Sequence, residues 1–288
     1  MTNNFKKIFI SSKPIVIAGP CSAESEKQVL ATAHKLKKHS NLIFRAGIWK
    51  PRTRPNTFEG IGVEGLNWLK KVKDETGLKT TVEVAKAKHV ELAIKHDVDI
   101  LWVGARTTGN PFAIQEIADA LKNTDITVLI KNPINPELNL WIGAIERLQD
   151  AGVYNIAAIH RGFFAYKNSK YRNIPQWQLA LDLKRKFPDL PMICDPSHIS
   201  GNSNLIMEIA QKAMDMSYDG LMIETHIDPK NALSDKEQQI TPLELDEILN
   251  NLIVRNFDTD DKEFKATLKW FFLLICLLTL NLTFHLIR

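Results

Sequence analysis

The chain has 288 residues, of which 44% are hydrophobic and 24% charged, an ordinary composition for a globular protein. A formal net charge of +4, without a basic run that contains interleaved aromatic residues, argues against a nucleic-acid-binding protein. Three cysteines, Cys21, Cys194 and Cys276, provide no disulfide framework and indicate a reducing compartment. Residues 1–12 contain no apolar segment long enough for a signal peptide, so we expect a cytoplasmic protein.

Short apolar runs rich in β-branched residues recur along the chain. They are nearly continuously apolar, as expected of parallel strands that are buried on both faces. The eight predicted strands are residues 14–18, 42–47, 78–84, 99–104, 127–131, 155–159, 191–194 and 220–223.

The segments between these runs predict amphipathic helices. In the first of them Val29, Ala33 and Leu36 share one face, and the lysines lie elsewhere. Pro111, Pro175 and Pro242 suit first-turn positions, where the missing N–H costs nothing. The predicted helices are residues 24–39, 63–76, 87–96, 111–122, 138–151, 175–187, 203–216 and 242–254.

This alternation predicts an α/β fold, a (β/α)8 TIM barrel that occupies residues 1–256. Eight strand–helix units in about 250 residues match such a barrel in size and order. The same pattern permits an open doubly wound sheet. The number of units favours the barrel, and no glycine-rich dinucleotide motif argues for the open sheet.

In a barrel of this kind, active-site residues come from the C-terminal strand ends and the loops that follow. Cys21, His198 and Glu224 lie where predicted strands end, and Asp235 lies just beyond the last strand. A thiolate, an imidazole and two carboxylates form a suitable shell for a divalent metal. Taken singly, each has a structural explanation, such as a core thiol or a hydrogen-bonded histidine. Cys194, inside a predicted strand, is interpreted as a buried core thiol.

Six cationic side chains occupy the same predicted rim. Such a cluster would repel itself strongly unless the site binds several negative charges. Arginine supplies planar contacts to phosphate and carboxylate, and lysine supplies a point charge. We therefore expect a substrate, or two, that carries phosphate and carboxylate groups. The six are Arg45, Lys50, Arg52, Arg106, Lys131 and Arg161.

The motifs GPCS, KPRT, GAR, DPSH and ALSD follow one another in this order. In this the chain resembles the 3-deoxy-D-arabino-heptulosonate-7-phosphate (DAHP) synthases, in particular their short type I-beta branch, over roughly residues 12–255. The resemblance implies a transferase that condenses phosphoenolpyruvate with erythrose 4-phosphate, the first step of the shikimate pathway towards aromatic amino acids. The sister family of 3-deoxy-octulosonate-8-phosphate synthases typically carries KANRS in place of KPRT and is the alternative. An inactive barrel that serves as a scaffold is a third hypothesis.

The resemblance also assigns roles to residues. It implies a divalent metal (Mn, Fe, Zn or Co) bound by Cys21, His198, Glu224 and Asp235. It implies that phosphoenolpyruvate is held by Arg45, Lys50, Arg106, Lys131 and Arg161. Erythrose 4-phosphate is expected to contact Lys50, Pro51, Arg52 and Thr53. The predicted catalytic residues are Lys50, as the group that transfers or orients a proton, together with Cys21 and His198.

The C-terminal end departs from the barrel pattern. Residues 257–269 resemble the linker or the start of a chorismate mutase domain, as some relatives carry, and residues 270–288 form an apolar tail. The tail is a frameshift product, a membrane anchor or an element for self-association, and it just reaches the length of a membrane-spanning helix. Apart from this tail we expect no contact with membranes or nucleic acid. The resemblance implies a homo-oligomer, either a dimer or a tetramer.

Overall fold

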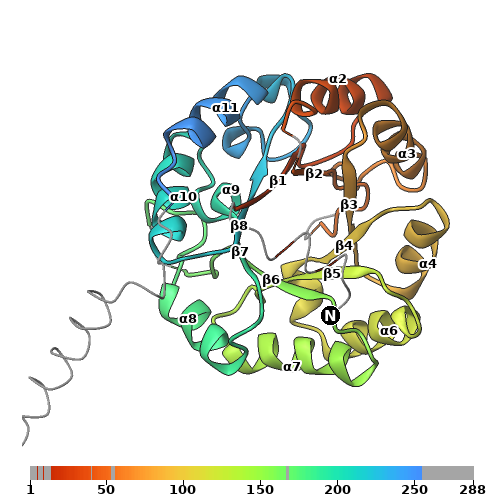
Figure 1. The fold of residues 1–288 in the computed structure, drawn as a ribbon, viewed down its shortest axis with the longest axis vertical. Helices are drawn as coiled ribbons and strands as arrows, with labels where there is room; N and C mark the ends of the chain where they lie inside the picture. The colour runs from red at the N-terminus through yellow and green to blue at the C-terminus, as the bar shows by residue number, and fades with distance from the viewer. Residues whose placement is uncertain are drawn as a thin grey trace, which may run out of the picture. The chain divides into compact units, whose positions relative to one another are not determined.

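The computed structural model describes residues 5, 9, 14–39, 41–52, 56–166 and 169–254. Within these ranges parallel strands close into one barrel in sequence order, each paired with its neighbours and β8 paired back to β1. Figure 1 looks down this barrel and shows the helices as an outer ring around the strands. The strands are β1 (Ile15–Gly19), β2 (Leu42–Arg45), β3 (Lys79–Val84), β4 (Ile100–Val103), β5 (Thr127–Lys131), β6 (Ile156–His160), β7 (Met192–Cys194) and β8 (Gly220–Glu224).

A helix follows each strand and covers the outside of the barrel. These helices are α2 (Glu26–Leu36), α3 (Glu64–Thr76), α4 (Ala87–Lys95), α6 (Pro111–Leu121), α7 (Leu138–Asp150), α8 (Trp177–Lys186), α10 (Ile206–Asp215) and α11 (Pro242–Asn251). Two short helices, α5 (Ala105–Thr108) and α9 (Pro196–Ser200), follow β4 and β7 directly. The sequence analysis did not predict them, because four or five residues are too few to show a helical period.

Local sequence explains where some of the helices begin. Asn110 caps α6 by accepting from the backbone N–H groups of Phe112 and Ala113. Thr241 and Glu244 form a capping box at α11. Pro111 and Pro242 occupy first-turn positions as predicted, but Pro175 does not. Helix α8 begins only at Trp177, because Gln176 adopts a left-handed conformation, so the predicted role of Pro175 is wrong.

Side chains alternate between the two faces of the barrel wall. One large cluster fills the layer between strands and helices, with Phe44, Val82 and Leu101 among its members. A second, separate cluster fills the inside of the barrel with Ile17, Leu129 and other apolar residues. This two-sided burial explains the nearly continuous apolar runs, and the predicted (β/α)8 barrel is confirmed.

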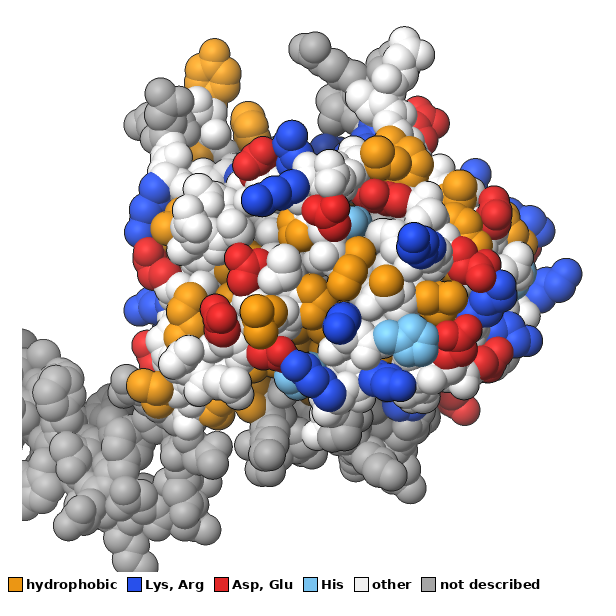
Figure 2. All heavy atoms as spheres, turned by 90° about the horizontal axis from the view of Figure 1, so that it is seen from above, with side chains coloured by type: hydrophobic (Ala, Val, Ile, Leu, Met, Phe, Trp, Pro, Cys, Tyr) orange, Lys and Arg blue, Asp and Glu red, His pale blue; other side chains and the backbone are white. Residues whose placement is uncertain are grey.

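The outer surface carries charges of both signs. On the side drawn in Figure 2, basic and acidic side chains are interspersed with hydrophobic and uncharged ones. None of the helices in the described part of the chain has the length and apolar character needed to cross a membrane. The predicted linker at 257–269 and the apolar tail at 270–288 lie outside the described residues.

Candidate functional site

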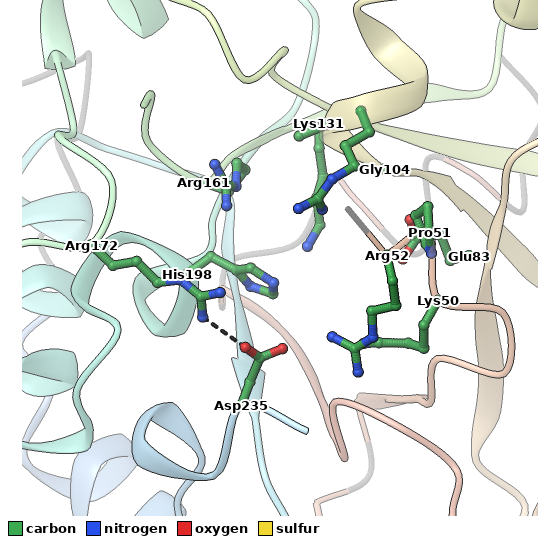
Figure 3. A pocket seen from close by; sticks show the side chains of 12 residues that line it. Lys50, Pro51, Arg52, Glu83, Gly104, Lys131, Arg161, Arg172, His198 and Asp235 are labelled. Atoms are coloured by element: carbon green, nitrogen blue, oxygen red, sulfur yellow. Dashed lines mark hydrogen bonds and ion pairs between the residues drawn. The ribbon is translucent and has the colours of Figure 1, made fainter. Parts of the chain in front are cut away.

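The pocket of interest lies over the C-terminal ends of the strands. Its lining combines strand-end residues with residues of the loops that follow, and Figure 3 shows their side chains pointing toward a common space. Half of the lining residues are lysines or arginines, so the space attracts anions. The lining residues are Lys50, Pro51, Arg52, Glu83, Gly104, Ala105, Arg106, Lys131, Arg161, Arg172, His198 and Asp235.

The four predicted metal ligands are brought together on one side of this pocket. The thiol of Cys21 donates to Oδ2 of Asp235 over 3.2 Å, although 214 residues separate them in the chain. Nε2 of His198 lies 3.7 Å from Oε1 of Glu224. Glu224 is fully buried at the end of β8, and Asp235 follows in the next loop. The convergence expected from strand order is therefore present.

The hydrogen bonds of His198 and Glu224 leave their inner atoms available. Asp195 accepts from the backbone N–H of His198 and lies 2.8 Å from Nδ1, which assigns the proton to Nδ1 and the lone pair to Nε2. Burial lowers the pKa of His198, which favours this neutral form. Gln238 donates to Oε2 of Glu224 over 2.7 Å, and the buried Oε1 accepts no hydrogen bond but lies 3.3 Å from NH2 of Arg45. Two acceptor atoms therefore face each other, an arrangement that a cation between them would stabilise.

Side-chain cations also contact Cys21 and Asp235. Nζ of Lys50 lies 2.9 Å from both the sulfur and the carbonyl oxygen of Cys21. Arg172 binds Oδ1 of Asp235 at 2.8 Å. As the side chains stand, no group of three or more His, Cys, Asp and Glu residues among those described has the geometry of a metal centre. The donor set fits a divalent metal in its chemistry, and the two cations would have to give way to it.

The thiol of Cys21 must also lose its proton before it can bind a metal. Burial and the neighbouring Glu224 raise its pKa to about 12, so the group is a neutral thiol at pH 7. A bound divalent cation is the kind of partner that would favour the thiolate, since coordinating thiols lose their proton.

A buried ion-pair network supports the anion-binding wall. Lys131 at the end of β5 donates to Oδ2 of Asp195 over 2.8 Å, and the same carboxylate holds His198. Burial opposes ionisation of Asp195, but His198 and Lys131 outweigh it and hold its pKa well below the usual range. Asp195 therefore holds both Lys131, a predicted substrate-binding residue, and His198, a predicted metal ligand.

The loop after β6 supplies a second cation. Arg161 donates from NH1 to Oδ1 of Asn173 over 2.8 Å, and its backbone N–H donates to Asn132. Burial lowers the pKa of Arg161 to about 10, which still leaves it charged at neutral pH. A partly buried guanidinium that donates to a neutral side chain suits an anionic ligand.

The remaining predicted substrate residues lie at different depths. Arg106, Pro51 and Arg52 line the pocket. Nε of Arg52 donates to the carbonyl oxygen of Phe58 over 2.8 Å. Arg45 lies deeper, with only 1% of its surface exposed. Its guanidinium lies 4.9 Å from the centre of the Trp102 ring and 3.3 Å from Glu224. Thr53 lies outside the described residues.

Three residues of the site did not figure in the sequence-based assignments. Glu83 occupies an inward position near the end of β3, where the period-two pattern of the strand could have revealed it. Asp195 belongs to the DPSH motif and forms the N-cap of α9, so its adjacency to His198 was a usable signal. Arg172 lies in the irregular segment between β6 and α8, where the sequence carries no periodic signal.

Two glycines give these side chains room. Gly19 ends β1 with φ of +147°, and a Cβ there would lie 2.1 Å from the carbonyl oxygen of Arg45. Gly104 follows β4, and its Cβ would lie 2.0 Å from Oε1 of Glu83. Gly19 therefore requires glycine, because a side chain would displace the β2 backbone, whereas a side chain at Gly104 would push aside the carboxylate of Glu83.

Fold and site together define a (β/α)8 barrel with a cation-lined pocket at the carboxyl ends of its strands. The chain belongs to the DAHP synthetase I family, which it matches over residues 6–256.

Individual relatives divide between two names. A phospho-2-dehydro-3-deoxyheptonate aldolase of Thermotoga maritima is 28% identical over 225 residues, which cover 78% of this chain and 64% of that protein. The match to this relative thus spans less than two thirds of its length. A 2-dehydro-3-deoxyphosphooctonate aldolase of Helicobacter pylori is 30% identical over 84% of this chain and 95% of that protein. The crystal structure of the T. maritima DAHP synthase superposes with a TM-score of 0.74 at 26% identity, covering 83% of this chain and 68% of that one.

Proposed function

We propose that the protein is a DAHP synthase that condenses phosphoenolpyruvate with erythrose 4-phosphate. A carbon–carbon bond forms between C3 of phosphoenolpyruvate and the aldehyde carbon, water adds at C2, and phosphate leaves with cleavage of its C–O bond. The observation that carries this proposal is the pocket wall, where Lys50, Arg106, Lys131 and Arg161 line a space that suits small anionic ligands. Membership of the DAHP synthetase I family and the KPRT motif support the same substrates.

In this proposal the cationic wall binds the two phosphorylated substrates side by side. Lys131 and Arg161 hold phosphoenolpyruvate, and Arg52 directs the aldose phosphate toward it. Such positioning contributes through proximity, and the fixed cations stabilise charge on the departing phosphate. Lys50, which lines the pocket and whose Nζ contacts Cys21, donates a proton to the alkoxide oxygen that forms at the former aldehyde carbon.

A divalent metal completes the proposed site. Cys21, His198, Glu224 and Asp235 would hold it, and the lone pair of His198 Nε2 together with the undonated Oε1 of Glu224 supports this assignment. Bound there, it would supply Lewis acidity at the aldehyde oxygen.

The test is an assay of the full chain. Phosphoenolpyruvate consumption is followed with erythrose 4-phosphate and, in parallel, with arabinose 5-phosphate, each with Mn²⁺ and with a chelator. We expect consumption with the four-carbon sugar that the chelator abolishes. Consumption in the presence of the chelator would reject the metal, and no consumption with either sugar would favour the scaffold hypothesis.

A second candidate is 3-deoxy-octulosonate-8-phosphate synthesis. The H. pylori octonate aldolase, aligned over 95% of its own length, supports it. The KPRT motif, which carries Arg52 beside Lys50, argues against it. Consumption with arabinose 5-phosphate alone would favour this candidate.

The two described cysteines provide a matched pair for testing the metal assignment. Cys21→Ala removes a ligand, and the loss of several kcal/mol of Lewis-acid stabilisation should lower kcat about a thousandfold or more. Cys194→Ala removes an equally buried thiol inside β7 and should keep both metal content and turnover. Metal analysis of the purified variants accompanies the assay. Full activity of the Cys21 variant would contradict the assignment.

A further inference from the structure

Arg172 makes an unusual contact for a pocket residue. Its NH1 donates to Oδ1 of Asp235 over 2.8 Å and to Oε1 of Gln238 over 2.6 Å. Figure 3 shows the guanidinium reaching across the pocket edge to this carboxylate. Partial burial opposes ionisation of Asp235, but Arg172 outweighs it, so the pKa of Asp235 lies below its usual range.

The backbone that carries Arg172 is anchored independently of this ion pair. The N–H of Arg172 donates to the carbonyl of Ser200, and that of Asn173 donates to the carbonyl of Ile199, both over 3.1 Å. Asn173 also donates to the carbonyl of His198. A Cβ on Gly201 would lie 2.5 Å from Cβ of Arg172, so the start of the side chain is closely packed. Only the outer part of the arginine is therefore free to change partner.

The hydrogen bonds to His198 and Glu224 differ from the contacts of Asp235 in the atoms that they occupy. Asp195 contacts Nδ1 of His198 and leaves Nε2, and Gln238 donates to Oε2 of Glu224, whose Oε1 accepts no hydrogen bond but lies 3.3 Å from Arg45. Asp235 has no such spare atom, because Arg172 contacts Oδ1 and the thiol of Cys21 contacts Oδ2.

We propose that Arg172 and a divalent cation compete for the carboxylate of Asp235, so that Arg172 weakens the metal affinity of the site. This inference rests on the metal site of the proposed function. A metal that binds Oδ1 of Asp235, alone or together with Oδ2, must displace the guanidinium. The guanidinium of Arg172, once released, then faces the pocket, which Arg172 and Arg161 both line.

The test measures the Kd of Mn²⁺ by isothermal titration calorimetry on the full chain after chelator treatment. Arg172→Gln should bind Mn²⁺ about threefold to fivefold more tightly than the wild type, the upper part of the range expected for loss of a half-exposed ion pair. Arg172→Lys keeps the charge but loses the forked donor geometry, and should lie between the two. Unchanged or weaker binding in Arg172→Gln would overturn the proposal.

Lys170→Gln is the matched control for charge alone. It removes one positive charge from the same loop, where Lys170 pairs with Glu208 at 2.7 Å rather than with Asp235. Its Kd should stay within about twofold of the wild type, because exposed charges are screened by solvent. An equal gain in both Gln variants would mean that general electrostatics, not competition, sets the affinity, and would overturn the proposal.

Failure of this inference is distinguishable from failure of the proposed function. A wild-type chain that binds Mn²⁺ and consumes both substrates, with no gain in Arg172→Gln, rejects only the competition. A wild-type chain that binds no Mn²⁺ rejects the metal site and the competition together. Circular dichroism of each variant verifies that the barrel is folded.

Discussion

The two ends of the barrel interior follow the same alternation of side chains but contain opposite chemistry. Toward the N-terminal ends of the strands the inside is apolar, with Ile15, Ile43 and Ile100 fully or nearly buried together with Phe5 and Phe9. At the C-terminal ends the next inward positions are ionisable. They are Arg45 on β2, Glu83 on β3, Lys131 on β5, and Glu224 on β8.

This difference separates stability from function within single strands. Apolar burial lowers the free energy of the folded state, whereas buried charges require partners to offset the cost of desolvation. The upper layer is incompletely satisfied, since Nε and NH1 of Arg45 and Oε1 of Glu224 have no hydrogen-bond partner. The apolar layer therefore stabilises the barrel, and the charged layer is arranged for ligands.

Among the tests of this comparison between the two layers, the largest effect is expected for the charged layer of β5. Lys131→Met removes the partner of Asp195 and a cation of the pocket wall. Truncating one partner of a buried charge pair at a binding site costs about 3 kcal/mol, so kcat/KM for phosphoenolpyruvate should fall roughly a hundredfold or more. Steady-state kinetics would measure this, and an unchanged kcat/KM would remove Lys131 from the substrate site.

A substitution in the apolar layer of the same strand should lower the free energy of unfolding and leave kcat/KM almost unchanged. Leu129 lies two residues earlier, fully buried inside the barrel. Leu129→Ala should lower the free energy of unfolding by about 2–5 kcal/mol because it leaves a cavity. Urea denaturation measures the loss, and kcat/KM per folded molecule should change less than about twofold. A large fall in kcat/KM at unchanged stability would break the division between the layers.

A buried ionisable group outside the pocket should affect stability through pH. His160 is fully buried at the end of β6. Its Nε2 lies 2.6 Å from the carbonyl oxygen of Pro175, and its Nδ1 lies 3.0 Å from the hydroxyl oxygen of Tyr218. Burial lowers the pKa of His160 to about 4. Between pH 6.5 and 4 the unfolded chain binds a proton that the folded chain does not, so stability falls as the pH falls.

For His160 the loss between pH 7 and pH 5 should be about 2 kcal/mol. Urea denaturation at the two pH values measures it. The variant His160→Gln should show a smaller difference between them, although it is less stable than the wild type at pH 7. An identical pH dependence in variant and wild type would assign the effect to other groups.

The smallest effect is expected for an ion pair on the surface. Lys88 and Glu91 lie 2.9 Å apart on α4, with more than half of each side chain exposed. Glu91→Gln should change the free energy of unfolding by less than about 0.5 kcal/mol and leave kcat unchanged. A loss above about 1 kcal/mol would mean that exposed charges also stabilise this barrel, which would blur the contrast with its charged interior.

The sequence by itself determined the architecture and much of the site. Eight apolar runs and the helical periods between them specify the barrel, because two-sided burial leaves a pattern in the chain. The positions of Cys21, His198 and Glu224 at strand ends were readable because parallel strands bring these ends to one rim. The first-turn role of Pro175 was misread, because the left-handed Gln176 that delays α8 has no signature in sequence.

Only the tertiary structure decided how the charged groups are partnered. Lys131 and Asp195 lie 64 residues apart, and no local pattern links them. The contact between Arg172 and Asp235 depends on how an irregular loop folds over α9, and the depth of Arg45 depends on the ring of Trp102 beneath it. Periodicity reports which face of an element is buried, but pairing across the barrel is set by packing between elements that are distant in the chain.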